Sequence, residues 1–567
     1  MSTEHPEHSA QHHASKFTSR QRTIALIIVA LAFVMDLLDN TIVNIAIPSI
    51  QSNLGASYAS IQWLIAGYSL SFAVLLITGG RMGDVFGYKK LFLSGVAGFT
   101  LASLLSGMAW NTEVLVAARL IQGGMAALMV PQVMSLMQVM FKPHERGGVM
   151  GLFGALAGVA ASLGPVIGGI LIHANIAGLD WRPIFLINIP VGLFALIAGA
   201  KYLPSGKSPH PLKLDIWGTF IVMLALFMIV FPLIEGRDLG WPAWSFGMMA
   251  ASLPVFGVFA LWQKRKEQID NSPLIPTALF KVKTFITGLG INLVFQGAMI
   301  GFFLPFTLLI QVGLGYEVVK AALTGIPTAV GISLAIGLFG QKLIPKLGRY
   351  AMSLGAVVMA AGLIITYLFV KHYGLDTTPW EFIPGLLVTG LGMGLVMSPI
   401  FSVVLADVDA KHAGSASGVM NAVQQLGGAI GVALIGVIFF GQLTLHADAS
   451  LTSVEPTIRS ELSKAHVPAQ AQDTIVKDMR TCFNDRVNEK DATATPDSCK
   501  QLQAGPQTPA SAAIAATLGD AAKKANTDNF INAFKAAAIY EVALVVITFG
   551  MSFLLPRHIR AQSMEVA

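Results

Sequence analysis

Residues 24–50 read IALIIVALAFVMDLLDNTIVNIAIPSI, a stretch that is apolar apart from a few polar side chains. A helix needs about 20 mainly apolar residues to cross about 30 Å of hydrocarbon, because its backbone amides must be satisfied internally. The stretch therefore predicts a membrane-spanning helix. Of the whole chain, 54% is apolar and only 12% is charged, about half the charged fraction of a typical soluble domain. We expect a polytopic membrane protein and exclude a secreted disulfide scaffold, a disordered chain and a nucleic-acid binder.

Further windows of this kind bring the predicted spans to fourteen, which puts both termini on one side. They begin near Ile24, Ile61, Leu91, Val114, Gly148, Ile184, Ile216, Phe246, Ile286, Ala321, Met352, Ile383, Gly414 and Ala536. Lys and Arg of the short loops gather on the side of the termini, beginning with Arg81, Lys89 and Lys90. The positive-inside rule makes that side cytoplasmic. We therefore expect a multi-pass protein of a bacterial cytoplasmic membrane with both termini in the cytoplasm.

Ionisable residues within the spans are functional candidates, because they are costly in hydrocarbon. The first span holds Asp36, Asp39, Asn40 and Asn44 on one face of the helix. Counted at 1.5 Å per residue, Asp39 and Arg119 of the fourth span share a depth of about 8 to 9 Å from the outer edge. This predicts an ion pair that protonation of the carboxyl would break. A permanent pair that only locks two helices is the alternative, and Asp36 is the competing titratable group.

Other polar residues of the spans give weaker indications. Asn292 and Gln296 of the ninth span are candidates for a polar cavity lining or for hydrogen bonds between helices. Glu541 is a candidate for a second proton site near the outer end of the last span, although a hydrated, interfacial glutamate is the favoured interpretation.

Cys482 and Cys499 lie in a polar segment, 442–532, that is external on this topology. That location favours a disulfide, with two unpaired thiols as the alternative.

Five local motifs resemble those of the major facilitator superfamily, and in particular its branch of fourteen-helix drug:proton antiporters. They are GRMGDVFGYKK at 80–90, RLIQG at 119–123, LGPVIGG at 163–169, LDNTIVNIAIP at 38–48 and WRPIFLINIP at 181–190. The resemblance implies a gating loop of Gly80, Arg81, Asp84, Gly87 and Lys89. It implies proton coupling near Arg119 and Gln122, and it implies an antiporter motif of Gly164, Pro165, Gly168 and Gly169. Small residues at four-residue spacing also let helices approach closely, so the glycines alone are weak evidence.

The resemblance also implies an all-α membrane protein with two six-helix bundles and two linker helices. The expected parts are a cytoplasmic tail (1–23), an N-terminal bundle (24–203), a linker (204–283), a C-terminal bundle (284–556) that includes the external segment, and a second tail (557–567). In this arrangement proton coupling and substrate binding involve Asp39, Asp36 and Arg119. The polar lining of the cavity is formed by Asn40, Asn44, Gln122, Asn292 and Gln296.

The expected function is a proton-coupled antiporter that exports amphipathic, cationic drugs or biocides. Export of one endogenous metabolite, siderophore or lipid is the main alternative on the same scaffold. A membrane receptor or enzyme is the rival from another class. We identify no catalytic constellation, metal-ligand spacing in the membrane or phosphate-binding loop. We expect transport to be driven by the proton gradient without a cofactor. The expected protein is a monomer in the lipid bilayer that binds no nucleic acid, and a periplasmic adaptor is left open.

Overall fold

The computed structural model describes residues 19–208, 212–339, 347–409, 412–489, 495–503 and 509–555, so the two predicted tails lie almost wholly outside the described residues. Thirteen described helices are long and apolar enough to cross a membrane, and one further apolar segment, Leu163–Ala174, is shorter. These segments match the fourteen predicted spans one by one. The described residues contain helices and no strand, and the predicted fold class, an all-α membrane protein of fourteen helices, is confirmed.

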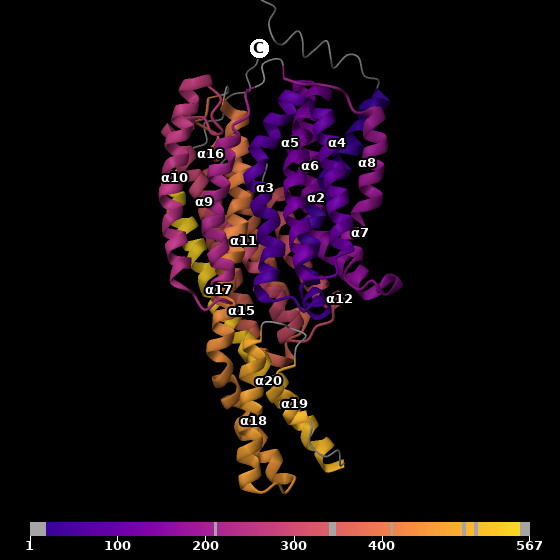
Figure 1. The fold of residues 1–567 in the computed structure, drawn as a ribbon, viewed down its shortest axis with the longest axis vertical. Coiled ribbons are helices and arrows are strands. Elements are labelled where there is room, and N and C mark those ends of the chain that lie inside the picture. The colour runs from indigo at the N-terminus through magenta and orange to yellow at the C-terminus, as the bar shows by residue number, and fades with distance from the viewer. Residues whose placement is uncertain are drawn as a thin grey trace, which may run out of the picture.

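The helices form two bundles joined by a linker (Figure 1). The N-terminal bundle consists of α2 (Ser19–Leu54), α3 (Tyr58–Phe86), α4 (Tyr88–Gly107), α5 (Thr112–Met140), α6 (Pro143–Ala174), η1 (Ile176–Gly178), α7 (Pro183–Leu186) and α8 (Asn188–Tyr202). The linker consists of α9 (Ile216–Glu235), α10 (Ala243–Asp270) and η2 (Thr277–Lys281). The C-terminal bundle consists of α11 (Lys283–Leu308), η3 (Leu309–Gly313), α12 (Val318–Thr324), α13 (Ile326–Leu334), η4 (Ala335–Phe339), α15 (Arg349–Tyr373), η5 (Gly374–Asp376), α16 (Pro379–Val404), α17 (Ala413–Lys464), α18 (Ala469–Asn488), α19 (Asp497–Gln503) and α20 (Pro509–Ser552).

Local sequence sets several helix ends. Ser57 caps α3 by accepting a hydrogen bond from the backbone N–H of Ser60 at 3.1 Å, and Asn111 caps α5 by accepting from that of Val114 at 2.9 Å. Between α3 and α4 the chain turns at Gly87, whose φ of 100° is a conformation that favours glycine. These turns are short, so consecutive helices run antiparallel through the bundle.

Helix α9 of the linker packs against α3 of the N-terminal bundle and against α17 of the C-terminal bundle, and α10 packs on α9. The hydroxyl groups of Thr78 on α3 and Thr219 on α9 are hydrogen-bonded at 2.7 Å. Near the other end of the same two helices, the indole N–H of Trp63 donates to Glu235 at 2.8 Å. Contacts at both ends of α3 therefore fix α9 along its length.

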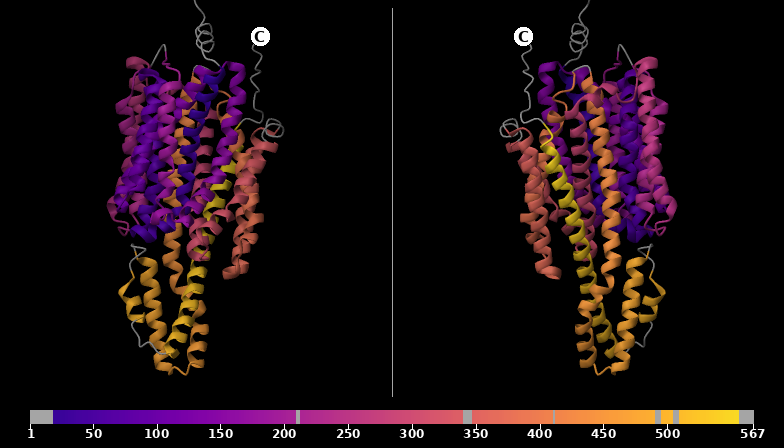
Figure 2. Two further views of the ribbon diagram at one scale, coloured as in Figure 1. Left: turned by 90° about the vertical axis from the view of Figure 1, so that its right-hand side faces the viewer. Right: turned by 90° about the vertical axis from the view of Figure 1, so that its left-hand side faces the viewer.

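The segment predicted as an external polar insertion is a helical tower, defined here as residues 442–532, that continues two of the spans. α17 and α20 run without a break from the bundle into the tower, and α18 and α19 pack beside them (Figures 1 and 2). Val454 and Ile458 of α17, Met479 and Phe483 of α18, and Ala525 of α20 belong to one buried apolar cluster in the tower. The insertion therefore has its own small core, which a polar composition alone did not indicate.

The tower also contains the predicted disulfide. Cys482 at the end of α18 and Cys499 in α19 are bonded across 17 residues of sequence. The alternative of two free thiols is therefore wrong.

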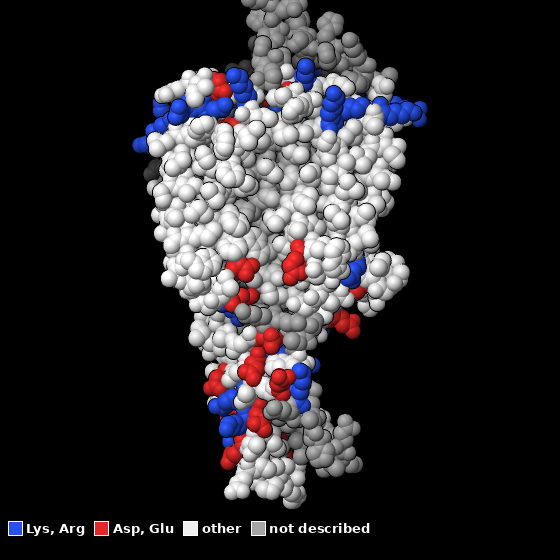
Figure 3. All heavy atoms as spheres, in the orientation of Figure 1, with Lys and Arg blue, Asp and Glu red and all other residues white. Residues whose placement is uncertain are grey.

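Charged side chains divide the surface into bands. In the face shown in Figure 3, Lys and Arg gather at the end of the bundles away from the tower, and a wide belt carries few charges. Acidic residues appear at the tower end, and residues of both signs appear on the tower. Helix α20 ends on the side of the bundles away from the tower (Figure 2), where the basic band lies. This is the arrangement of charge around an apolar belt that a membrane-spanning protein requires.

Candidate functional site

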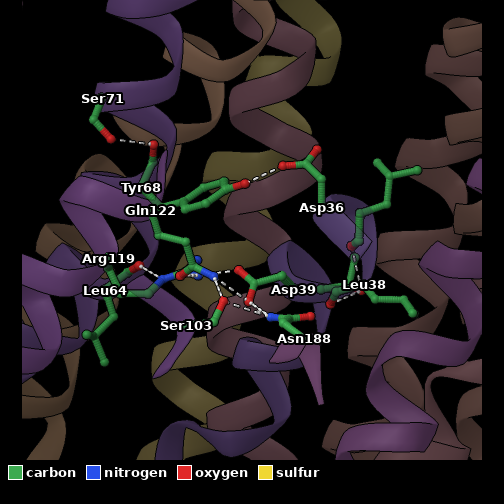
Figure 4. Close-up of polar contacts among 12 residues, drawn as sticks. Asp36, Leu38, Asp39, Leu64, Tyr68, Ser71, Ser103, Arg119, Gln122 and Asn188 are labelled. Atoms are coloured by element: carbon green, nitrogen blue, oxygen red, sulfur yellow. Dashed lines mark hydrogen bonds and ion pairs between the residues drawn. The ribbon is translucent and has the colours of Figure 1, made fainter. Parts of the chain in front are cut away.

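The predicted ion pair between the first and fourth spans is present. Asp39 on α2 and Arg119 on α5 are in direct contact, through the carboxylate Oδ2 and guanidinium Nη1 atoms (Figure 4). Each residue is only 1% exposed. The matched depth estimated from sequence therefore corresponds to a contact deep inside the N-terminal bundle.

Neutral side chains from three helices complete the surroundings of Asp39. Gln122 on α5 donates to Asp39 Oδ1 at 2.8 Å, and Asn188 on α8 donates to the same oxygen at 2.7 Å. The hydroxyl of Ser103 on α4 accepts from both amides, at 2.8 and 3.2 Å. The sequence motifs predict Gln122 for this site, but they do not point to Ser103 or Asn188. Asn188 lies within one of the recognised motifs, and that position was the available signal for it.

Arg119 is held by more than the carboxylate. Its guanidinium donates to Gln122 Oε1 at 2.7 Å and to the backbone carbonyl of Leu64 at 3.2 Å. It also lies 4.3 Å from the ring centroid of Tyr68, within the range of a cation–π interaction. The carboxylate of Asp39 is buried and paired with Arg119 in this conformation, and its expected contact with cargo stays a prediction.

Asp36 lies one turn from Asp39 and binds a different partner. The hydroxyl of Tyr68 on α3 donates to Asp36 Oδ1, and Asp36 is 6% exposed. Since the ring of Tyr68 also faces Arg119, this tyrosine connects the two acidic residues of α2 (Figure 4). Sequence reasoning did not include Tyr68, because a tyrosine in an apolar span carries no distinctive pattern.

The remaining candidates for a polar lining lie outside this network. Asn40 and Asn44 are half-buried on α2, and the hydrogen bonds of Asp39 described above go to other residues. Asn292 and Gln296 of α11 are buried, and the amide of Asn292 donates to the carbonyl of Met420 on α17 at 2.9 Å. Asn292 therefore forms a hydrogen bond between helices, the second of the two interpretations.

The loop over 80–90 contacts its own bundle and the linker. Arg81 donates to the backbone carbonyls of Ser272 at 2.9 Å and of Leu274 at 3.2 Å, both in the linker. Asp84 accepts from the hydroxyl of Tyr88 at 3.0 Å. Among the described residues, Tyr88 thus binds Asp84 and the linker provides acceptors for Arg81; the gating role that the resemblance implies for this loop stays a prediction.

The other members of this loop have structural contacts. Gly80 packs toward Pro131 of α5, Gly87 forms the turn between α3 and α4, and Lys89 donates to the carbonyl of Ala200 on α8 at 2.8 Å. The loop thus ties α3, α4, α5 and α8 together at the end of the bundle away from the tower.

The glycines of α6 lie where two other helices pack closely against it. A Cβ atom on Gly164 would lie 2.0 Å from the hydroxyl oxygen of Thr41 on α2, and one on Gly168 would lie 2.6 Å from Ile42. A Cβ on Gly169 would lie 3.0 Å from Ala322 of α12, in the other bundle. Together with Pro165, which removes a backbone donor within α6, these glycines make α6 a contact surface between the bundles.

The bundles also contact each other at the tower end. The rings of Tyr58 on α3 and Phe440 on α17 have centroids 4.0 Å apart, and Gln311 of η3 donates to the carbonyl of Ile45 on α2 at 3.1 Å. The guanidinium of Arg237, in the loop between α9 and α10, lies 5.6 and 5.4 Å from the two ring centroids. The linker loop thus reinforces the contact between the bundles at this end.

Glu541 is not the hydrated, interfacial glutamate favoured from sequence. It is 1% exposed and lies between helices of the C-terminal bundle. The sequence estimate was wrong because the last span was taken to begin near Ala536, whereas α20 begins at Pro509 in the tower.

Comparison with known proteins places these features in a family. The sequence profile of the Major Facilitator Superfamily matches residues 29–432. A Streptomyces coelicolor protein named as a probable actinorhodin transporter is 40% identical over 536 residues, which cover 94% of this chain and 92% of that protein. The tetracenomycin C resistance and export protein of Streptomyces glaucescens is 32% identical over 466 residues, covering 80% and 84% of the two chains.

A solved structure supports the same fold. A bacterial homolog of the human lysosomal transporter Spinster, in an inward-facing and unoccupied conformation, aligns with a TM-score of 0.58 at 14% identity, covering 95% of this chain and 98% of that one. A family profile that matches most of the chain, relatives of similar length and a shared fold agree with the helix count. The chain therefore belongs to the Major Facilitator Superfamily, as a multi-pass membrane transporter of small molecules and not an enzyme.

Proposed function

We propose that this protein is a proton-coupled antiporter that exports amphipathic drugs or antibiotics across the cytoplasmic membrane. Two relatives are named for transport or export of an antibiotic, and a third, from Streptomyces alboniger, is named as a puromycin resistance protein at 33% identity over 77% of this chain. The observation that carries the proton coupling is the buried pair of Asp39 and Arg119. The proposed cycle draws its energy from the proton gradient and uses no cofactor.

Protonation of Asp39 changes the balance of charge inside the bundle. The ionised carboxylate accepts from Arg119, Gln122 and Asn188. A protonated carboxyl is neutral and has lost one acceptor site, so it no longer compensates the guanidinium charge. The buried Arg119 then favours a conformation in which it reaches water or another partner. We propose that this preference moves α2 and α5 relative to the other bundle.

The proposed cargo does not need a positive charge. A carboxylate exposed to the cavity would favour cations, and this was the reason for expecting cationic substrates. Asp39 is instead buried and paired with Arg119. We therefore propose that cargo is selected by amphipathic character and shape, and that proton binding acts on the transport cycle rather than through contact with the cargo.

We propose that the basic end of the bundles is cytoplasmic and that the tower projects outside. The band of Lys and Arg at the end away from the tower (Figure 3) supports this orientation through the positive-inside rule. The disulfide in the tower also fits an oxidising compartment. The transporter is proposed to act as a monomer.

Export of one endogenous product is the second candidate function. Relatives named for single antibiotics, actinorhodin and tetracenomycin C, favour it. A susceptibility panel separates the two candidates: changed resistance to several unrelated compounds on overexpression supports drug export, and protection against one compound alone supports export of a single product.

The coupling is tested in proteoliposomes that contain the purified protein and a pH-sensitive dye. With a proton gradient imposed, addition of a transported antibiotic is expected to increase proton flux through the wild-type protein and not through Asp39→Asn. Glu113→Gln is the matched control, because Glu113 is an exposed carboxylate on α5, the helix of Arg119. Substrate-dependent proton flux in Asp39→Asn at the wild-type rate would contradict the assignment of Asp39.

A further inference from the structure

Glu541 is a buried carboxylate that the mechanism above does not use. Its helix, α20, packs against α11 and α17 at this point. A Cβ atom on Gly301 of α11 would lie 2.7 Å from Glu541 Oε1, and 3.6 Å from the carbonyl oxygen of Gly431 on α17. One turn away along α11, the carbonyl oxygen of Gly297 would lie 2.3 Å from a Cβ on the same Gly431. The carboxyl group is therefore enclosed by glycine backbone, where helices approach too closely for larger side chains.

The surroundings of this carboxyl group are apolar. Neither oxygen of Glu541 has a hydrogen-bond partner among the described residues. The charged side chains of α11 and α15 lie near the ends of those helices, at Lys283, Arg349 and Lys371. The titratable group beside it is the hydroxyl of Tyr540, which has no partner among the described residues either. An ionised carboxylate in such a site is strongly disfavoured, so the carboxyl carries its proton in this conformation.

A structural role does not account for Glu541. Buried polar groups that hold helices together are hydrogen-bonded in the great majority of cases. Glu541 forms no such bond within the described part of the chain. A leucine or methionine would fill the same volume without the cost of burying a carboxyl group.

The position of Glu541 mirrors that of Asp39. In the N-terminal bundle, the carboxylate of Asp39 lies where the first helix, α2, meets the last, α8, through Asn188. In the C-terminal bundle, Glu541 lies where the last helix, α20, meets the first, α11, at Gly301. Asp39 and Gly301 each lie fifteen residues beyond the predicted start of the first span of their bundle, or about 22 Å at the helical rise. Both bundles thus place a carboxyl group at the same depth and in the same helix pair.

We propose that Glu541 is a second proton-binding site, located in the C-terminal bundle, and that its proton is exchanged once in each transport cycle. This inference rests on the proposed proton-coupled export. In the conformation described here the proton is held between α11, α17 and α20. Separation of α20 from the other two helices would admit water, and the carboxyl group would then release the proton. Each cycle would carry one proton at Asp39 and another at Glu541.

The first test asks whether Glu541 is protonated and does not depend on transport. Dicyclohexylcarbodiimide is apolar and reacts with protonated carboxyl groups in membrane interiors. The full-length protein in detergent is incubated with it over a range of pH, and the modified residues are identified by mass spectrometry. We expect modification of Glu541 near neutral pH that declines as pH rises. The exposed Asp520 of the same helix is expected to stay unmodified near neutral pH. Failure to modify Glu541 even at acidic pH would overturn the proposal.

The second test measures the number of protons in each cycle. In proteoliposomes with the membrane potential held at zero, an exchanger of one proton for a neutral substrate sustains a substrate gradient of about tenfold per pH unit, and an exchanger of two protons sustains about a hundredfold. We expect about a hundredfold for the wild-type protein and about tenfold for Glu541→Gln. Asp520→Asn, an exposed change on the same helix, is expected to match the wild type.

The outcomes separate this inference from the proposed function. If the wild-type protein sustains no gradient under a pH difference, the proposed function itself fails. If Glu541→Gln sustains the wild-type gradient, coupled export stands and the second proton site is wrong, whether or not carbodiimide modifies Glu541. Thermal unfolding of the purified variant confirms that it is folded before the gradient is measured.

Discussion

Replacement of Asp39 by asparagine is expected to destabilise the N-terminal bundle as well as uncouple transport. Three donors converge on this carboxylate, with Arg119 on Oδ2 and with Gln122 and Asn188 on Oδ1. Asparagine offers one acceptor oxygen and one donor group. If its oxygen keeps the two amide hydrogen bonds, its own amide nitrogen must face the guanidinium of Arg119.

The size of the expected loss in stability follows from the burial of Arg119. This residue is 1% exposed, and its remaining partners, Gln122 Oε1 and the carbonyl of Leu64, are neutral. Removal of one member of a buried ion pair typically costs about 3–5 kcal/mol, because the other charge is left uncompensated. The double variant Asp39→Asn/Arg119→Gln removes that charge. We therefore expect the double variant to be more stable than Asp39→Asn, with a coupling free energy of about 2 kcal/mol.

The assay is SDS-induced unfolding of the purified protein, followed by tryptophan fluorescence, for both single variants and the double variant. Glu113→Gln is the control and is expected to lie within about 0.5 kcal/mol of the wild type, because Glu113 is exposed. Equal stability of Asp39→Asn and this control would refute the reasoning. A double variant whose loss of stability equals the sum of the two single losses would also refute it, since the pair would then contribute nothing.

Three further predictions concern the turn, the tower and the contact at the tower end. Gly87→Ala places a side chain at a φ of 100° and is expected to lower the free energy of unfolding by about 1–3 kcal/mol in the same assay. The control is Gly257→Ala, an exposed position within α10 with open space around it. This change is expected to be neutral or slightly stabilising. Cys482→Ser opens a loop of 17 residues and is expected to speed proteolysis of the tower without changing transport, so loss of transport would contradict a purely local effect. Arg237→Ala removes the contact with two rings from opposite bundles and is expected to speed labelling of a cysteine placed at Gln62 by an impermeant thiol reagent added from the tower side. An unchanged labelling rate would show that Arg237 does not help to hold the bundles together.

The elements of the fold could be predicted from sequence because the bilayer imposes a length on each of them. Each predicted span corresponds to an apolar helical segment of the described chain. The pairing of Asp39 with Arg119 could be predicted for a related reason. The rise and direction of each helix give the depth of each residue in the membrane. Opposite charges at equal depth in hydrocarbon attract one another and lower the cost of burying both. The disulfide between Cys482 and Cys499 was the favoured prediction, with two unpaired thiols as the alternative, because both cysteines of the chain lie in one segment that is external on the predicted topology.

The depth of a residue in the membrane says nothing about the rotation of its helix or about where that helix continues. Glu541 was placed at a hydrated edge because the apolar window was taken as the whole helix, whereas α20 extends into the tower. The hydrogen bond that Tyr88 donates to Asp84 within the loop depends on how the two side chains are oriented, which their spacing in the sequence does not show.

By itself the sequence determined the number of spans and the carboxylate and guanidinium that meet. Hydrocarbon penalises polar backbone and lone charges in a way that depends on composition and spacing. The tertiary structure alone decided which neutral donors surround that pair. Tyr68, Ser103 and Asn188 come from three different helices, and a hydrogen bond depends on the rotation and approach of each helix to within a fraction of an ångström. The enclosure of Glu541 by the glycines of α11 and α17 has the same origin, since it exists only where segments far apart in the chain are packed together.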